Sequence, residues 1–298
     1  MLEAPQEGEW GVRVEPEYIR TVTSAFSNVR LPVRWSNHSA VTADATLDEN
    51  FARRVDEVVD ALLSSGVYVV LDLHHYSQLF GSPLLREKEV DPAVLETRLV
   101  NIWKHVAQRY RNRSPKLIFE LLNEPNGRVD AAAWNALAPR VLAAVRSSNP
   151  DRTVLIGPVY WNSVRELKSL QLPPDRHLIV TVHNYDPFDF THQGVPYLGR
   201  DIPVGTTCCS ARQKAEIVDA LETARAWSVR TGYPLYLGEY GSFEQADMNS
   251  RAAYTRIVRD EAEKRGIPWA FWEFASTFGV WSPKTGTWVE PLRKALLD

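Results

Sequence analysis

The sequence predicts an α/β protein in which parallel strands close into a single (β/α)8 barrel, a TIM barrel, over residues 1–298. Short apolar runs alternate with amphipathic stretches along the whole chain, as in a parallel sheet covered by helices. Nearly every run ends in side chains capable of chemistry, and barrel active sites are built at this C-terminal rim from several strands. An open doubly wound sheet often carries a glycine-rich phosphate loop, and this sequence shows none.

The predicted strands are short runs rich in Val, Ile, Leu and aromatic residues. Strands buried on both faces of a parallel sheet are expected to be continuously apolar rather than alternating. In chain order the seven predicted strands cover 28–33, 67–74, 117–124, 153–159, 177–185, 234–240 and 269–275.

The stretches between the strands carry apolar residues at helical spacing. In 48–66, Phe51, Val55, Val58 and Leu62 recur on one face, and Gly66 provides a stop signal. Similar patterns predict helices near 15–25 and at 92–111, 130–148, 210–230 and 248–265.

A regular barrel has eight strands, and the first is missing from this prediction. Residues 1–10 are neither alternating nor β-branched. Seven strands would leave two unpaired edges, which invite misassociation unless they are covered. Three outcomes are open: an open barrel with local disorder, the N-terminal segment folding into the gap, or a neighbouring subunit covering it. We expect a barrel that keeps its shape around a defective seam, with self-association as a candidate repair and with weakened activity because Arg30 borders the seam.

Composition excludes several functional classes. A net charge of −3 gives no broad basic surface for nucleic acid or anionic lipid, so a neutral partner is expected. No apolar run approaches the roughly 20 residues that span a bilayer. The first ten residues lack the features of a signal peptide, which predicts either an intracellular protein or one whose export segment has been removed. The adjacent Cys208 and Cys209 exclude a disulfide framework and a multi-cysteine metal site, and they are predicted to be buried or idle thiols.

Two glutamates hold equivalent places at the ends of predicted strands. Glu124 follows the run "FELLN" and Glu239 follows "LYLG". A buried carboxylate is costly unless it is paired, protonated or used. In a barrel both would project over the same rim, and two carboxyl groups that flank the scissile bond are what acetal hydrolysis requires. The pair predicts a glycosidase with one acidic and one nucleophilic or basic carboxyl.

The polar residues at the other strand ends favour catalytic carboxyl groups over carboxyl groups that only form structural ion pairs. A single strand-end glutamate is more often part of an ion pair, and that is the expected role of Glu120, which lies lower in its strand. Arg30 and Arg34 share one face, so either could be the inward arginine, and the "VRLP" motif favours Arg30. A metal at His74 and His75 is disfavoured because adjacent strand residues point to opposite faces. No cofactor is predicted.

Six motifs carry a family resemblance that covers essentially the whole chain. They are "NVRLPVRWSNH", "LDLHHY", "FELLNEPNG", "VTVHNYDPFDFTHQG", "YLGEYGSF" and "WAFWEFASTFGVW". In their order and spacing the chain resembles glycoside hydrolase family 5 cellulases, which belong to the retaining clan of barrel glycosidases.

The resemblance implies a role for each matching residue near the reaction. Glu124 would be the acid/base and Glu239 the nucleophile. Arg30 would bind and orient the nucleophile's carboxylate, and Tyr185 would donate a hydrogen bond to the same group. His183 would lie near the acid/base.

Further matching residues would hold the sugar on the non-reducing side. Asn123 would bind the 2-hydroxyl of the sugar under attack. His74, and His75 as a candidate, would contact that side of the substrate. Trp272 would stack under the sugar, and Glu273 would bind its hydroxyls.

The remaining candidates lie at the periphery of the site. Glu3, in "LEAP", would contact substrate, and His192, in "THQG", would support the site. Tyr197 stands where close relatives often have tryptophan. Several loop aromatics are each either sugar platforms or packing residues: Trp35, Trp161, Phe188, Tyr197 and Trp281.

The resulting prediction is a retaining endo-β-1,4-glucanase that cleaves internal bonds of cellulose and related β-glucans by double displacement. Retention requires the two carboxyl groups to lie roughly 5 Å apart, whereas inverting enzymes hold them farther apart. A β-mannanase or broad β-1,4-glycanase is the alternative that shares the same catalytic residues. A weakly active or merely carbohydrate-binding barrel is a second candidate, and a metal-dependent barrel hydrolase is a third.

Overall fold

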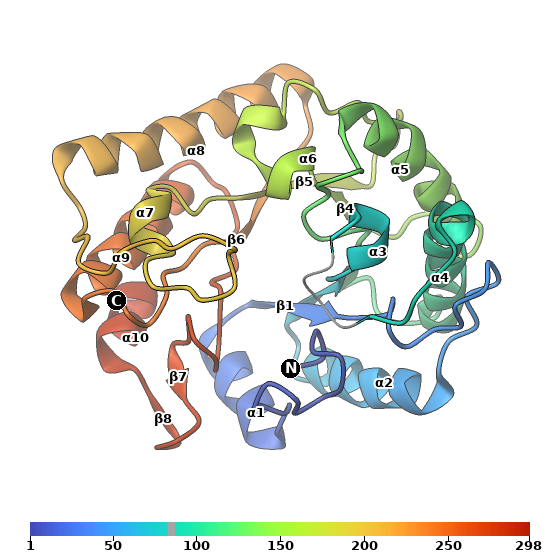
Figure 1. The fold of residues 1–298 in the computed structure, drawn as a ribbon, viewed down its shortest axis with the longest axis horizontal. Coiled ribbons are helices and arrows are strands. Elements are labelled where there is room, and N and C mark those ends of the chain that lie inside the picture. The colour runs from blue at the N-terminus through green and yellow to red at the C-terminus, as the bar shows by residue number, and fades with distance from the viewer. Residues whose placement is uncertain (83–86) are drawn as a thin grey trace. The chain divides into compact units, whose positions relative to one another are not determined.

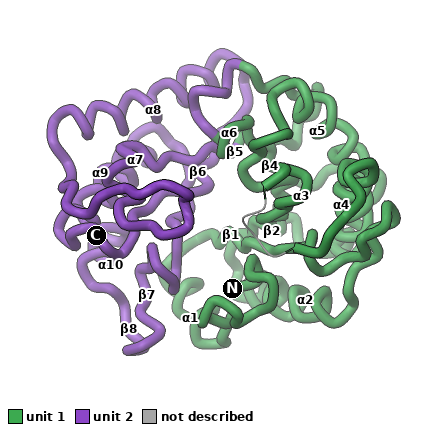
Figure 2. Tube along the Cα trace, viewed as in Figure 1, with its two compact units in different colours: residues 1–162, 169–180 green, residues 163–168, 181–298 purple. Residues whose placement is uncertain are grey.

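The computed structural model describes residues 1–82 and 87–298. The chain forms two compact units, shown in different colours in Figure 2. Unit 1 comprises residues 1–162 and 169–180, and unit 2 comprises residues 163–168 and 181–298.

Unit 1 is built on a parallel sheet whose strands follow one another in chain order (Figure 1). The register is continuous: Arg30 lies opposite Val70, and Asp72 lies opposite Glu120. The strands are β1 (Asn28–Val33), β2 (Tyr68–Leu73), β3 (Leu117–Glu120), β4 (Val154–Ile156) and the first half of β5 (Leu178–His183). Parallel pairing in chain order is what the strand–helix alternation predicted.

Helices connect these strands, and the long ones bury the apolar stripes that the sequence predicted. In α2 the stripe contains Phe51, Val55, Val58 and Leu62, all buried, and Asp48 caps the first turn. The helices of unit 1 are α1 (Pro16–Ala25), α2 (Glu49–Ser64), α3 (Ser77–Phe80), α4 (Leu95–Tyr110), α5 (Ala131–Arg146) and α6 (Val159–Asn162), with a 3₁₀ turn η1 (Pro92–Val94).

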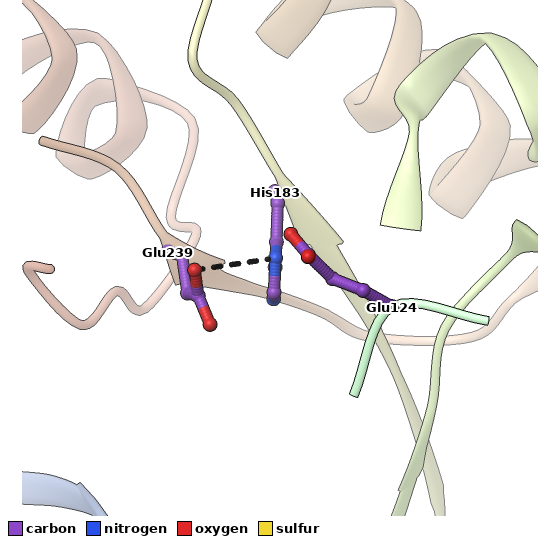
Figure 3. Close-up of side chains that lie close together, drawn as sticks. All are labelled: Glu124, His183 and Glu239. Carbon is purple, nitrogen blue, oxygen red and sulfur yellow. Dashed lines mark ion pairs between the residues drawn. The ribbon is translucent and has the colours of Figure 1, made fainter. Parts of the chain in front are cut away.

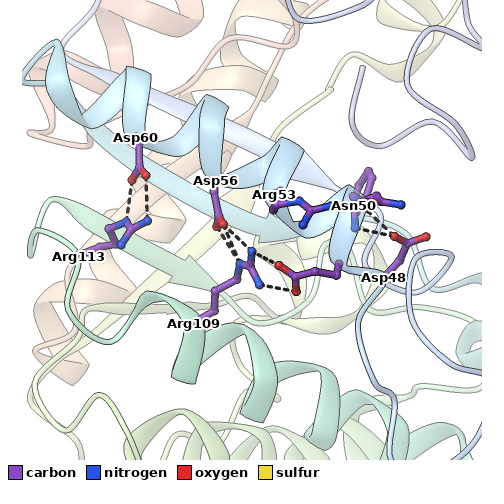
Figure 4. Close-up of polar contacts among 9 residues, drawn as sticks. Asp48, Asn50, Arg53, Asp56, Asp60, Arg109 and Arg113 are labelled. Carbon is purple, nitrogen blue, oxygen red and sulfur yellow. Dashed lines mark hydrogen bonds and ion pairs between the residues drawn. The ribbon is translucent and has the colours of Figure 1, made fainter.

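Ion pairs join α2 to α4 and to the residues just after α4 (Figure 4). Arg109 donates to both oxygens of Glu49 at 3.0 and 2.9 Å, and one of its nitrogens lies 2.6 Å from an Asp56 oxygen. Just beyond the end of α4, Arg113 forms a two-point contact with Asp60 at 2.7 and 2.9 Å. Paired forks of this kind fix the register of one helix against the other.

Unit 2 contains the last three residues of β5 and the neighbouring strand β6 (Leu235–Glu239). A hydrogen bond from Asn184 N–H to the Glu239 carbonyl joins their ends at 3.0 Å. The other elements of unit 2 are η2 (Val164–Glu166), α7 (Phe188–Thr191), α8 (Ala211–Thr231), α9 (Met248–Lys264), a hairpin of β7 (Trp281–Ser282) and β8 (Thr287–Trp288), and α10 (Glu290–Leu297). The hairpin and α10 were not predicted.

The predicted strand at 269–275 is wrong as a continuous strand. Trp269 forms an isolated parallel bridge with Leu237 of β6, and Trp272 N–H donates to the Tyr240 carbonyl at 2.8 Å. At Gly241 a Cβ would lie 1.9 Å from the Trp272 carbonyl oxygen, so the two backbones meet too closely for a side chain. The segment therefore runs beside β6, contacts it only at single points and then bends. Its apolar residues reflect packing rather than a continuous strand.

The first residues of the chain lie against the end of β1 within unit 1. Arg34 N–H donates to the Leu2 carbonyl at 3.0 Å, and the Asn37 side chain donates to the Pro5 carbonyl at 3.1 Å. Leu2 and Ala4 are buried. Of the three outcomes open for this segment, local disorder is not what the structure shows.

Two further observations bear on the composition. Cys208 and Cys209 form a disulfide with each other, so the prediction of idle thiols is wrong. Adjacent cysteines gave no sequence signal for such a bond, because disulfide patterns are read from spaced pairs. None of the described helices is both long and apolar enough to cross a bilayer.

Candidate active site

Glu124 follows strand β3 and sits in an unusual backbone conformation. After β3 ends, Leu121 N–H donates to the Leu155 carbonyl and Asn123 N–H to the Leu73 carbonyl, so both neighbouring strands still hold the chain. Glu124 itself has a φ of 51°, in the left-handed region that side chains rarely adopt. Strain of this kind persists where surrounding contacts over-determine it, and it clusters at functional sites.

The surroundings of Glu124 favour its protonated form. Loss of solvation on burial raises the pKa of this carboxyl to about 7, and the negative charge of Glu120 adds to the rise. The positive charge of Arg30 opposes both effects. A carboxyl that exchanges its proton near neutral pH is suited to act first as an acid and then as a base.

Arg30 is the centre of a buried polar network in unit 1. It donates to both oxygens of Glu120 at 2.7 and 2.8 Å and to the Asn123 side-chain oxygen at 2.8 Å. The same guanidinium lies 3.1 Å from Asp72. Arg30 is therefore an inward arginine, as predicted, and Glu120 has the structural ion pair expected of it. Asn123 is held in place by the same group.

Asp72 is a member of this network that the sequence reasoning missed. Its oxygen lies 2.7 Å from His74 Nδ1, and the residue is fully buried. Burial raises the pKa of Asp72 to about 7, with Arg30 opposing and the charges of Glu124 and Glu3 adding to the rise. The available signal was spacing, because residues two apart in a strand share a face and Asp72 stands two before His74.

His74 and His75 lie together rather than on opposite faces, so that expectation is wrong. Their ring centroids are 4.5 Å apart in an edge contact. Alternation fails here because β2 ends at Leu73 and both histidines lie beyond it. Burial, helped by the charges of His74 and Arg34, lowers the pKa of His75 well below its usual value, so this ring stays neutral.

Glu239 ends strand β6 in unit 2 and is buried. The Tyr185 hydroxyl donates to its Oε2 at 2.8 Å, which is the hydrogen bond that the family resemblance implied. His183, at the end of β5, places Nδ1 3.7 Å from the same oxygen, as Figure 3 shows. A hydrogen bond donated to an ionised carboxylate stabilises the charged form, which is the form a nucleophile needs.

Aromatic contacts fix the orientation of Tyr185. Its ring lies 4.8 Å from His192 and 6.2 Å from Phe278, edge-on to both. His192 is also stacked on Phe188 at 4.1 Å. Burial and the charge of Arg200 lower the pKa of His192 to about 4, so its ring is neutral and acts through packing. The Tyr185 hydroxyl is thereby aimed by its surroundings.

The remaining candidates vary in exposure. Trp272 and Glu273 are half-buried, and Trp272 packs against a cluster formed by Val195, Phe243 and Phe278. Glu3 is buried and pairs with the amino group of Met1.

Four of the five loop aromatics divide into an exposed pair and a buried pair. Trp161 is 58% exposed, and it lies with Tyr160 and Asn162 in a run of left-handed residues. Tyr197 is exposed as well, so both remain candidate sugar platforms. Trp35 and Trp281 are buried and belong to the core, so the platform interpretation is wrong for them.

Parallel strands that alternate with helices, with carboxyl groups such as Glu124 and Glu239 at or beyond the strand ends, are typical of barrel glycoside hydrolases. The model of the cellulase family, glycosyl hydrolase family 5, matches residues 4–277. The chain belongs to this family, as its motifs predicted.

Similar proteins agree with this assignment. Endoglucanase H of Acetivibrio thermocellus is 34% identical over 273 residues, which cover 91% of this chain and 28% of that protein. Cellulase/esterase CelE of the same organism is 27% identical over 97% of this chain and 37% of its own length. The chain thus spans about a third of the length of these curated relatives.

Solved structures resemble the chain over nearly its full length. The crystal structure of endoglucanase Cel5A from Thermotoga maritima is 36% identical, with a TM-score of 0.92 over 99% of this chain and 94% of that one. A hyperthermophilic endo-β-1,4-glucanase in complex with substrate has a TM-score of 0.94 at the same identity. The likeness confirms the predicted (β/α)8 barrel class.

Proposed function

We propose that this protein is a retaining endo-β-1,4-glucanase that hydrolyses internal bonds of cellulose and related β-glucans. The observation that carries the proposal is the contrast between two strand-end carboxyls. The pKa of Glu124 is raised to about 7, whereas Glu239 accepts a hydrogen bond from Tyr185. Membership of the family and the names of the similar endoglucanases support the same activity.

The mechanism divides the reaction into two displacements. Glu239 attacks the anomeric carbon while Glu124 gives its proton to the leaving oxygen, and a glycosyl-enzyme forms. Glu124, now ionised, removes a proton from water, which attacks the same carbon and releases Glu239. Each carboxyl returns to its starting state, and the configuration of the sugar is retained.

Other residues position the substrate and the nucleophile in this proposal. Tyr185 orients the Glu239 carboxylate, and Asn123 binds the 2-hydroxyl of the sugar under attack. His74 contacts the sugar on the non-reducing side, where Trp272 stacks and Glu273 binds hydroxyls. Arg30 holds Asn123 in place, and its contact with the nucleophile stays a prediction.

The stereochemical outcome tests the mechanism. The separation of roughly 5 Å between the two carboxyl groups, which retention requires, stays a prediction. Proton NMR of cellopentaose hydrolysis should show the β-anomer of the new reducing end first, with the α-anomer growing only by mutarotation. Early formation of the α-anomer would show inversion and would contradict the double displacement.

A panel of polysaccharides tests the substrate. Hydrolysis of carboxymethylcellulose and lichenan should exceed that of xyloglucan and mannan. Mannan belongs in the panel because a similar solved structure is described as a complex with mannotriose. Glu239→Ala should abolish all hydrolysis, and Glu57→Gln, an exposed glutamate on α2, should leave it intact. Activity that survives Glu239→Ala, or a wild type that binds glucan without cleaving it, would contradict the proposal.

A further inference from the structure

Trp10 is an exposed aromatic residue that none of the proposed roles uses. It lies in the segment before α1, and 45% of its surface is accessible. Large apolar side chains exposed on loops are common, so exposure alone decides nothing. Its neighbours make the residue unusual.

The indole of Trp10 rests on a buried guanidinium. Arg34 Cζ lies 5.2 Å from the ring centroid, and the Arg34 side chain is fully buried. Among the described residues its three guanidinium nitrogens make no hydrogen bond. Burial lowers the pKa of Arg34 to about 10, with Glu87, Glu3 and Glu9 opposing the shift. A cation held against the face of the ring fixes the plane of the indole.

Trp10 also continues a row of rings that leads to the candidate active site. Its ring centroid lies 6.2 Å from that of His75, in an edge contact, and His75 lies 4.5 Å from His74. His74 is held by Asp72. The neutral His75 ring can both donate and accept hydrogen bonds, so it offers polar contacts beside an apolar face.

We propose that Trp10, seated on Arg34, is a stacking platform for one additional glucose unit of a β-1,4-glucan, beyond the sugar that contacts His74 and His75 on the non-reducing side. This inference rests on the proposed function. The flat indole suits the C–H face of a glucose ring, and His75 lies where the ring's hydroxyls would meet a polar partner.

Tyr68 provides a matched control within the same unit. It is 50% exposed and lies over a cation, with Lys116 Nζ 5.4 Å from its ring centroid. Tyr68 is the first residue of β2, whereas the histidines follow the last, so it lies at the opposite end of that strand. Loss of either ring removes a comparable exposed aromatic from a cation.

The experiment measures kcat/KM for cello-oligosaccharides of three to six glucose units. The loss of kcat/KM caused by Trp10→Ala should increase with the length of the substrate. It should reach roughly 10-fold or more at the length that first fills the platform, and it should appear mainly as a higher KM. Trp10→Phe should recover part of the loss, and Tyr68→Ala should behave as wild type at every length. An equal loss at all lengths would make Trp10 a cap on Arg34, and no loss at any length would also overturn the platform.

A binding measurement separates this inference from the proposed function. Cellotriose and cellohexaose are titrated calorimetrically into Glu239→Ala, with and without Trp10→Ala. Weaker binding of the hexamer alone supports the platform even if the wild type hydrolyses no β-1,4-glucan, a result that would refute only the proposed function. If both proteins bind the hexamer with equal affinity, the platform is refuted. That result would not affect the test of the proposed function by hydrolysis.

Discussion

At the scale of single residues, Glu124 combines a strained backbone conformation with a raised side-chain pKa. Its left-handed backbone turns the chain out of the strand while neighbouring strands still hold Leu121 and Asn123. Burial and the charge of Glu120 then keep the carboxyl protonated to near neutrality. The sequence could place this residue at a strand end, but the backbone angle and the charge balance come from tertiary contacts.

Replacing Glu124 with Gln should slow hydrolysis most for substrates whose leaving group must be protonated. Hydrolysis of cellulose derivatives should fall by about 10²–10⁴-fold, as expected for loss of a general acid. Release of an activated phenol such as 2,4-dinitrophenol needs no proton, so glycosyl-enzyme formation from a dinitrophenyl cellobioside should be largely spared. A burst of phenol measured by stopped-flow absorbance checks this, and equal loss with both leaving groups would remove Glu124 from the acid role.

Asp72 should act as a positioning residue through His74 and Arg30. Asp72→Asn keeps the size of the side chain but removes the ionisable carboxyl that both partners face at 2.7 and 3.1 Å. We expect kcat/KM to fall by about 10-fold with a changed pH profile, since removing a group that holds a functional side chain in place typically costs about 10–100-fold. Asp60→Asn, on the surface pair with Arg113, is the control. A lower melting temperature with an unaltered pH profile would reduce Asp72 to a structural role.

At the scale of elements, helices and strands were predicted with different success for a physical reason. An amphipathic helix such as α2 carries its own stripe and cap, so its residues specify it locally. A buried strand appears in the sequence only as an apolar run, and its backbone hydrogen bonds are made with neighbouring strands that are distant in the chain. Residues 269–275 have the composition of a strand, yet they make single contacts with β6, which no local pattern reveals.

The candidate site divides in the same way. Glu124, Glu239 and Tyr185 lie at or just beyond strand ends and Arg30 lies within β1, and the family motifs together with the predicted strands indicated all four as candidates. The contact of Arg30 with Asp72 depends on how two strands pair, and that of Trp10 with Arg34 depends on how the segment before α1 folds back. Such contacts join residues whose relation the linear order does not express.

The ion pairs between α2 and α4 should contribute measurable stability. Arg109→Ala removes the contacts with both Glu49 and Asp56, and it should lower Tm by roughly 1–4 °C, because partly exposed pairs contribute little each. The effect should shrink in 1 M NaCl, where screening is strong. Arg53→Ala is the matched control because its bond to Asn50 stays within α2. Calorimetry that finds equal effects of both changes would show that the helix-to-helix pairs add nothing.

At the scale of the whole molecule, the raised pKa values of Glu124 and Asp72 make stability depend on pH. Each carboxyl holds its proton in the folded state to about pH 7 and loses it in the unfolded state near pH 4. The unfolded state therefore binds fewer protons between these values, and these groups make stability fall as pH rises from about 4 to 7.

Comparison of Glu124→Gln with the wild type isolates this effect from the histidines, whose lowered pKa values act in the opposite sense. Urea denaturation gives the free energy of unfolding of both proteins. The difference between the variant and the wild type should shift in favour of the variant by about 1–3 kcal/mol between pH 4 and pH 8. A difference that stays constant across this range would mean that Glu124 has an ordinary pKa.

The disulfide between Cys208 and Cys209 leaves the oxidised chain without a free thiol. Any cysteine introduced by mutation would then be the one nucleophilic sulfur available to a maleimide dye. A fluorophore could be attached at a chosen surface position without first removing native cysteines. Engagement of a glucan chain could be followed by fluorescence in real time, provided that labelling is carried out without reductant.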